Sequence, residues 1–213
     1  MTWFLTSKGT TIDLAYINPD AIDITDVAHS LAHINRFNGH AIRAISQAEH
    51  SLAVLEVIRR HFNIQDPAVQ AAALLSHGHE YLTGHISRPM KELIGCTEWD
   101  VIEARIQKQF LSRFGLTTAF HTFSGQIWAA NQYALSVERE QLMPADGETW
   151  PCQIKYPASA VDWLRFNDCR ISWRPPLYWA RQFLDEYHHL TRRMNERLSM
   201  IAPAMAIQAG DHQ

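Results

Sequence analysis

The sequence predicts an all-α fold with a small N-terminal β-hairpin. Apolar residues recur at helical spacing in several segments, as Val27, Leu31 and Ile34 do in the first of them. Residues that commonly cap helices precede these segments, and Gly residues follow several of them. Two short strand-like runs, residues 3–6 and 11–14, flank a turn that contains Gly9. We therefore expect one hairpin followed by a set of packed helices.

Length and composition indicate one globular domain spanning residues 1–213. Domains commonly have about 100–200 residues, and 46% of this chain is hydrophobic. Within it we expect a hairpin segment at 1–20, an irregular covering segment at 143–175 and a frayed tail at 202–213. A net charge of −3 gives no electrostatic basis for binding duplex nucleic acid or an anionic membrane.

Cysteine usage and the N-terminal residues favour the cytoplasm. The three cysteines have unrelated spacing and form no CxxC pair, which argues for a reducing compartment. The first residues contain neither a basic leader nor a long apolar run, so we predict no signal peptide. No uncharged apolar run approaches the roughly 18 residues that a membrane span needs.

The first two helices are predicted from caps and from apolar periodicity. Thr25 or Asp26 is the expected N-cap of the first helix, which Gly39 would end. Ser46, with Glu49 three residues later, forms a capping-box pattern for the second helix. His50 then lies at the inner end of an apolar face that the helix presents to the core.

A third helix is predicted from Asp66 and Pro67, as N-cap and first helical residue, to a C-terminal Gly84. Its inward face would carry Val69, Ala73, Ser76, His77 and Glu80.

The later helices follow the same logic. We expect a short segment from Pro89 to Gly95, a helix from Thr97 to Gly115, another with Ser124 as its N-cap, and a last one over residues 176–199. The helix from Ser124 would place Ile127, Asn131, Ala134 and Glu138 on one face, with Glu138 and Arg139 forming an ion pair. The irregular segment contains three tryptophans that either cover a pocket or, the favoured interpretation, anchor the loop to the core: Trp150, Trp163 and Trp173.

Histidine is concentrated in one part of the chain. Eight of the 12 His lie between His29 and His85. This density, spread over several predicted helices, is typical of the surroundings of a metal or phosphate site. The carboxylates that usually accompany such histidines are mostly missing, and a functional interpretation has to explain their absence.

Several short motifs carry a resemblance to a known family. They are Ile17–Asp20, Ile24–Leu31, Ile34–His40, Ser46–Ser51, Glu80 with Leu82–Gly84, Pro89–Lys91, and Glu138–Leu142. In this order, and with the helices placed as above, they resemble the HD-domain metal-dependent phosphohydrolases. The nearest branch is the small bacterial and phage one that contains 5′-deoxynucleotidases and dATP triphosphohydrolases. The resemblance covers about residues 1–195 and implies an HD-type helical fold.

The resemblance implies a metal site with substituted ligands. Its early His corresponds to His50, its His-Asp pair to Ser76 and His77, and its distant Asp to Asn131. A later Asp, which assists proton transfer in the family, corresponds to His85. In an alternative register His77 is the metal His and Gly78 the Asp, with one residue deleted. We disfavour it because a deletion inside a helix rotates all later residues by about 100°.

The substituted site leaves two possibilities for a metal. His50 and His77, with His79 or His85, could hold Zn, Co, Ni or Mn through neutral imidazoles. Alternatively these side chains fill the space of a lost metal, and no cofactor is bound.

Two charged residues are the other candidate functional groups. Glu80, with His85, would either orient a water for catalysis or pair with Arg36 in an empty pocket. The resemblance places Arg36 near a substrate phosphate, which a guanidinium can bind bidentately, with Phe37 and His40 beside it.

Two functional hypotheses follow. In the first, the chain is a phosphohydrolase that attacks a nucleotide phosphate with metal-activated water. In the second, it is an inactive HD-fold protein that binds a nucleotide or a nucleoside phosphate without hydrolysis. In both cases the resemblance implies a homodimer.

Overall fold

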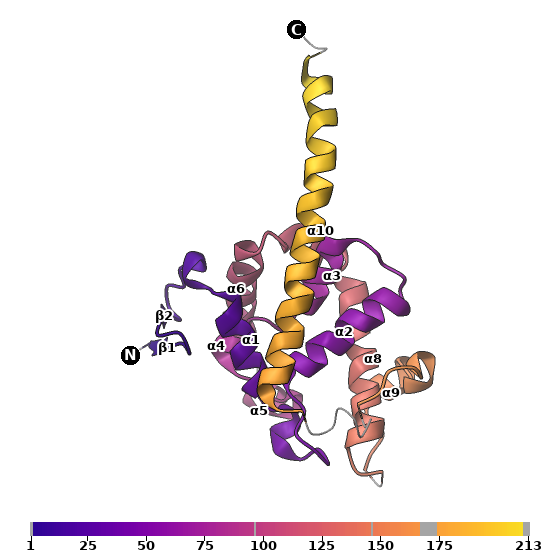
Figure 1. Cartoon of the computed structure of the whole chain (residues 1–213). Helices are drawn as coiled ribbons and strands as arrows, with labels where there is room; N and C mark the ends of the chain where they lie inside the picture. The colour runs from indigo at the N-terminus through magenta and orange to yellow at the C-terminus, as the bar shows by residue number, and fades with distance from the viewer. Residues whose placement is uncertain (1, 96, 146, 167–173, 211–213) are drawn as a thin grey trace.

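The chain folds as helices preceded by one β-hairpin, as the sequence predicts (Figure 1). The structure, a computed structural model, describes residues 2–95, 97–145, 147–166 and 174–210. Short 3₁₀ turns η1 (Pro19–Ala21), η2 (Arg36–Gly39) and η3 (Ala158–Val161) join some of the elements. The strands and helices are β1 (Trp3–Leu5), β2 (Thr11–Asp13), α1 (Ile24–His33), α2 (Gln47–Arg60), α3 (Pro67–Leu74), α4 (Glu80–Thr83), α5 (Arg88–Ile94), α6 (Thr97–Arg113), α7 (Thr117–Thr122), α8 (Ser124–Leu142), α9 (Pro151–Lys155) and α10 (Pro176–Gly210).

The N-terminal hairpin has the predicted turn. β1 and β2 are antiparallel, with Trp3 opposite Asp13 and Leu5 opposite Thr11. Gly9 has φ +82°, a left-handed conformation that favours glycine. Hydrogen bonds from Ser7 and from the Lys8 backbone to Asp26 tie the turn to α1.

The core lies between α10 and the helices against which it packs, which are α1, α2 and α3. The first half of α10 packs along α1, α2 and α3, and α2 also packs against α8 (Figure 1). The helix runs past the predicted end at Ser199, and its distal half projects from the body (Figure 1). In the part of the chain that the structure describes, no helix is both long and apolar enough to cross a membrane.

Helix caps agree with the sequence at two positions and differ at two others. Ser46 accepts a hydrogen bond from Glu49 N, and Asp66 accepts from Ala68 N and Val69 N. The predicted cap at Thr25 or Asp26 is wrong, because Asp23 takes that role and accepts from Thr25 N at 2.7 Å. Ser124 is also not a cap but the first residue of α8.

The third helix is not continuous, which corrects the prediction. α3 ends at Leu74, residues 75–79 form turns, and α4 begins at Glu80. Successive i→i−3 bonds replace the helical pattern, as Gly78 N donates to Leu75 O and Glu80 N to His77 O. A Cβ at Gly78 would lie 2.1 Å from the ring of the fully buried Phe110, so only glycine fits there. The objection to the alternative register is that a deletion inside a helix would rotate all later residues. Since the helix is interrupted here, that objection does not apply to this segment.

The segment 143–175 contains more regular structure than predicted, namely α9 and η3. Trp150 packs against Phe37 with ring centroids 5.7 Å apart, and Arg60 lies 3.9 Å over the Trp163 ring. These contacts anchor the segment to the body of the protein, as expected. Trp173 and residues 211–213 of the expected frayed tail lie outside the described residues.

Candidate functional site

Four parts of the fold bring together the predicted site residues and Glu138, which was not predicted as part of the site. His50 lies on the first turn of α2, and Asn131 and Glu138 lie on α8, which packs against α2. Arg36 opens the 3₁₀ turn η2 that leads toward α2. The turn after α3, with α4, supplies the remaining candidates, which are Ser76, His77, Glu80 and His85.

His50 is fully buried and uses both ring nitrogens. Nδ1 lies 2.6 Å from Glu138 Oε1, and Nε2 lies 2.7 Å from Oδ1 of Asn131. Burial, followed by the charge of Arg36, lowers the pKa of His50, so the ring is neutral. A neutral ring that donates to Glu138 from Nδ1–H has only a lone pair at Nε2. The Asn131 amide must therefore turn its NH₂ toward the ring for both groups to be satisfied.

Arg36 is bound within the same buried cluster. Its Nη2 and Nε donate to Glu138 Oε2 at 2.8 and 3.2 Å, and its Nη1 donates to Gln47 Oε1 at 2.8 Å. Burial alone would raise the pKa of Glu138, but Arg36 and His50 outweigh it and keep the carboxylate charged. We call the five side chains that these bonds connect the buried network: Arg36, Gln47, His50, Asn131 and Glu138.

The buried network corrects two predicted ion pairs. Arg36 pairs with Glu138 instead of Glu80. Arg139 does not pair with Glu138 but donates to the backbone oxygens of Pro144 and Glu148.

A second set of groups lies beside this network. Glu80 Oε2 accepts a hydrogen bond from His85 Nδ1 at 3.0 Å, and the two side chains are 6% and 16% exposed. The His77 ring stands edge-on to the His50 ring, with centroids 5.1 Å apart. Burial, followed by His50 and Arg36, holds the pKa of His77 well below its usual range. His77 is therefore a neutral ring, 3.1 Å from the Ser76 hydroxyl.

The donor set does not fit a divalent metal. The His50 lone pair faces Asn131, Glu138 is held by Arg36 and His50, and these bonds occupy the groups that a metal would need. Among the described residues, no group of three or more His, Cys, Asp or Glu is arranged to hold a metal ion. Position 78, the Asp of the alternative register, has no room for a side chain next to Phe110.

Phe37 and His40 differ in their surroundings. The Phe37 ring lies 5.2 Å from Arg36 Cζ and packs on Trp150. His40 is exposed, and its backbone N–H donates to Phe37 O. Phe37 and Asn38 both have positive φ, 55° and 51°, so this turn is conformationally strained.

Sequence reasoning missed two members of the buried network and one supporting cluster. The sequence did contain a sign of the role of Glu138, because Glu138 follows Asn131 by seven residues on one helix face. Nothing in the sequence pointed to Gln47.

The supporting cluster joins α5 and α6 to the turn after α3. His79 Nδ1 lies 2.6 Å from Gln107 Oε1, and Gln107 donates to Ser76 O. His79 and Lys91 outweigh burial and lower the pKa of Glu103 to about 2.

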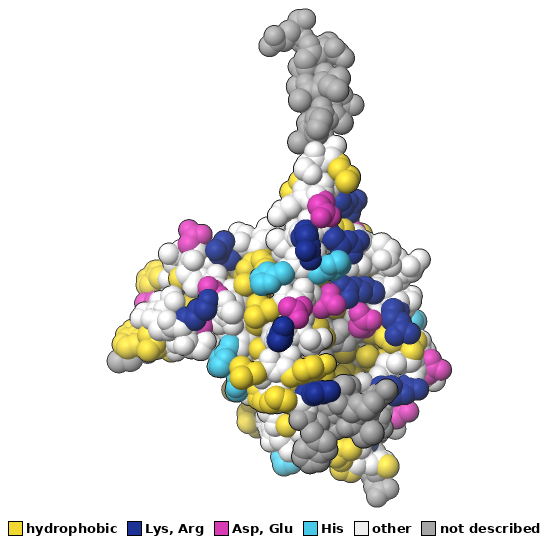
Figure 2. Space-filling view, viewed as in Figure 1, with side chains coloured by type: hydrophobic (Ala, Val, Ile, Leu, Met, Phe, Trp, Pro, Cys, Tyr) yellow, Lys and Arg dark blue, Asp and Glu magenta, His cyan; other side chains and the backbone are white. Residues whose placement is uncertain are grey.

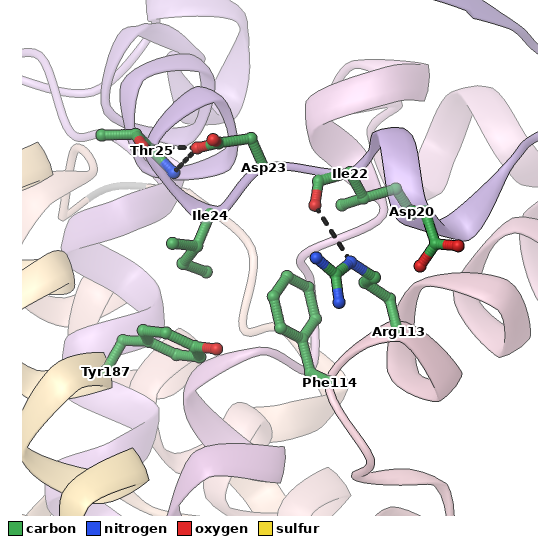
Figure 3. A pocket seen from close by; sticks show the side chains of 8 residues that line it. All are labelled: Asp20, Ile22, Asp23, Ile24, Thr25, Arg113, Phe114 and Tyr187. Carbon is green, nitrogen blue, oxygen red and sulfur yellow. Dashed lines mark hydrogen bonds between the residues drawn. The ribbon is translucent and has the colours of Figure 1, made fainter.

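Two open pockets lie away from the buried network. A pocket of about 360 Å³ opens between η1, α1, α6 and α10, where the Phe114 and Tyr187 rings and Arg113 face it (Figure 3). Another, of about 280 Å³, lies beside Glu140 and Arg165. None of the site residues predicted from the sequence lines either pocket. On the face seen in Figure 2, acidic and basic side chains are interspersed.

Two proteins are similar to this chain over most of its length. An uncharacterized protein of Rhodobacter capsulatus is 33% identical over an alignment of 147 residues, and the alignment covers 66% of this chain and 72% of that protein. The uncharacterized protein YfdR of Escherichia coli is 28% identical over 161 residues, 76% of this chain and 84% of YfdR. No model of a known protein family matches the chain. The similarity to the first relative is extensive enough that this chain belongs to the same protein family as that Rhodobacter capsulatus protein.

Proposed function

We propose that this chain binds a nucleotide or nucleoside phosphate without hydrolysing it, as an HD-like protein that has lost its metal site. The observation that carries the proposal is that both ring nitrogens of His50 are hydrogen-bonded, one to Glu138 and the other to Asn131. Metal-assisted hydrolysis needs a cation with open coordination positions to activate water. Here the groups that correspond to the ligands are bonded to one another instead.

The Glu80–His85 pair is the best candidate for contact with the phosphate. Glu80 holds His85 through Nδ1, which leaves Nε2 of the 16% exposed ring to donate to an anion when the ring is protonated. Arg36 is only 4% exposed, and its guanidinium already donates two hydrogen bonds to Glu138. It could contact the phosphate directly only if its side chain rearranged. The nucleotide class itself rests on the resemblance of residues 1–195, which also suggests a homodimer. Cysteine usage suggests the cytoplasm as its compartment.

A hydrolytic function is the second candidate, and the same pair favours it. A carboxylate that orients a partly exposed imidazole is a common arrangement for proton transfer. In that case Glu80 and His85 would act on water or on the leaving group.

One experiment separates the two functions. Purified full-length protein is titrated calorimetrically with deoxynucleoside mono- and triphosphates, with and without chelator, while released phosphate and bound metal are measured. We expect binding that chelator does not change, no phosphate release, and at least about tenfold weaker binding in His85→Ala, a loss of about 1.4 kcal/mol. His189→Ala, an exposed His on α10, serves as the matched control and should bind like the wild type.

Metal-dependent turnover that disappears in both Glu80→Ala and His50→Ala would establish the hydrolytic function and reject our proposal. Absence of binding to every nucleotide and to inorganic phosphate would reject both.

A further inference from the structure

Two histidines on α1 belong to neither the buried network nor the Glu80–His85 pair. His29 and His33 are one helical turn apart, where side chains four residues apart become neighbours. Their ring centroids are 4.3 Å apart and the ring planes meet at 32°. His33 is exposed and His29 partly so, and both can be reached from solvent.

The His33 ring is held in one tautomer. Its Nδ1 lies 2.7 Å from the backbone oxygen of His29, and a carbonyl oxygen only accepts, so Nδ1 carries the proton. In the neutral ring Nε2 then carries the lone pair. Metal-binding histidines commonly donate their other ring N–H to a carbonyl in this way.

The helix beneath the pair is rigidly placed. Val27, Ala28 and Leu31 on the opposite face are fully buried, and α1 packs along α10. In the described residues, no hydrogen bond or ion pair engages the His29 ring. To direct one nitrogen of each ring toward a shared point, only these two side chains have to rotate, and both lie outside the core.

We propose that His29 and His33 form a two-imidazole chelate for a divalent transition metal of the copper, nickel or zinc class. Imidazole nitrogen suits these ions, whereas Mg²⁺ and Ca²⁺ prefer oxygen ligands. Water would complete the coordination, because the residues described in the structure provide no third ligand of the usual types beside the pair. This site is independent of the nucleotide-binding proposal.

Copper(II) alone is the probe for the test. The full chain is titrated with Cu²⁺ by calorimetry, and the bound ion is examined by electron paramagnetic resonance for nitrogen couplings. We expect one strongest site with two coupled imidazole nitrogens, one nitrogen in His29→Ala or His33→Ala, and affinity at least about tenfold lower in each. Loss of an outer-shell partner typically lowers metal affinity by roughly 10–100-fold. Loss of a direct ligand should lower Cu²⁺ affinity by more than this when no other donor takes its place.

The matched control replaces both His188 and His189, two exposed adjacent histidines on α10 that do not share a helix face. This double variant should retain the strongest site and its two-nitrogen signal. Unchanged affinity and couplings in both α1 variants, or loss of the site in the control, would overturn the proposal. Circular dichroism spectra like that of the wild type confirm that the variants are folded.

Discussion

At the scale of single residues, the buried network pairs its charged groups with one another inside the core. Glu138 receives bonds from Arg36 and His50 at once, and neither it nor His50 is exposed. Arg36 is compensated by this one carboxylate and by the amide oxygen of Gln47. Removing a member therefore leaves a charge or a polar atom buried without its partner.

Replacement of Glu138 by Ala tests how much the fold depends on this network. Arg36 would remain buried without its counter-charge, and the free energy of unfolding should fall by roughly 3–5 kcal/mol. Urea denaturation followed by circular dichroism measures the change. Glu140→Ala, at an exposed position of the same helix, should change stability by no more than about 0.5 kcal/mol. Equal effects of the two substitutions would contradict the assigned role of Glu138.

At the scale of elements, Asp66 connects two helices that are far apart in the sequence. Its Oδ1 caps α3, and its Oδ2 lies 2.6 Å from Arg197 Nη1 on α10. Burial opposes ionisation, but Arg197 and the backbone N–H groups lower the pKa of Asp66. The ion pair is largely solvated, with side-chain exposures of 39% and 56%, so we expect the cap to contribute more than the pair.

Three substitutions separate the two roles of Asp66. Asp66→Ala removes the cap and should lower the free energy of unfolding by about 0.5–2 kcal/mol. Asp66→Asn retains a capping oxygen and, like Arg197→Ala, should cost no more than about 1 kcal/mol. Thermal or urea unfolding measures all three. A larger loss in Arg197→Ala than in Asp66→Ala would show instead that docking of α10 dominates.

At the scale of the whole molecule, the two neutral buried rings make stability depend on pH. The folded-state pKa values of His50 and His77 are lowered, mainly by burial. Below the ordinary imidazole pKa of about 6.5, the unfolded chain takes up protons that the folded protein does not. Each ring then lowers stability by up to about 1.4 kcal/mol per pH unit as the pH falls. Glu138, whose pKa is also lowered, adds to the loss at still lower pH.

His77→Gln should reduce the pH slope of the unfolding free energy, relative to the wild type, by up to about 1.4 kcal/mol per unit below roughly pH 6.5. Chemical denaturation at a series of pH values gives the slope for each protein. His189→Gln should leave the slope unchanged, since that side chain is exposed. An identical slope in wild type and His77→Gln would mean that His77 titrates normally in the folded state.

Local features of the sequence were sufficient for most helices. Ser46, Asp66 and Gly9 act through bonds or backbone angles within a few residues, and they were predicted correctly. Asp23 was missed because three potential caps lie within four residues, and only the folded backbone selects among them. The break after Leu74 was missed because Gly78 is required there by Phe110, a contact with a distant helix.

The helical class, the hairpin, several caps and the concentration of histidine in the region of interest can all be predicted from the amino-acid sequence. The partners of the polar groups cannot, because they depend on how the helices pack. Glu138 is 88 residues from His50 and 102 from Arg36, and it could equally have paired with the adjacent Arg139. Helical period says which face a side chain occupies but not which segment covers that face. Packing of α2 against α8 made that selection, because a buried charge is stable only where its partners are brought within bonding distance.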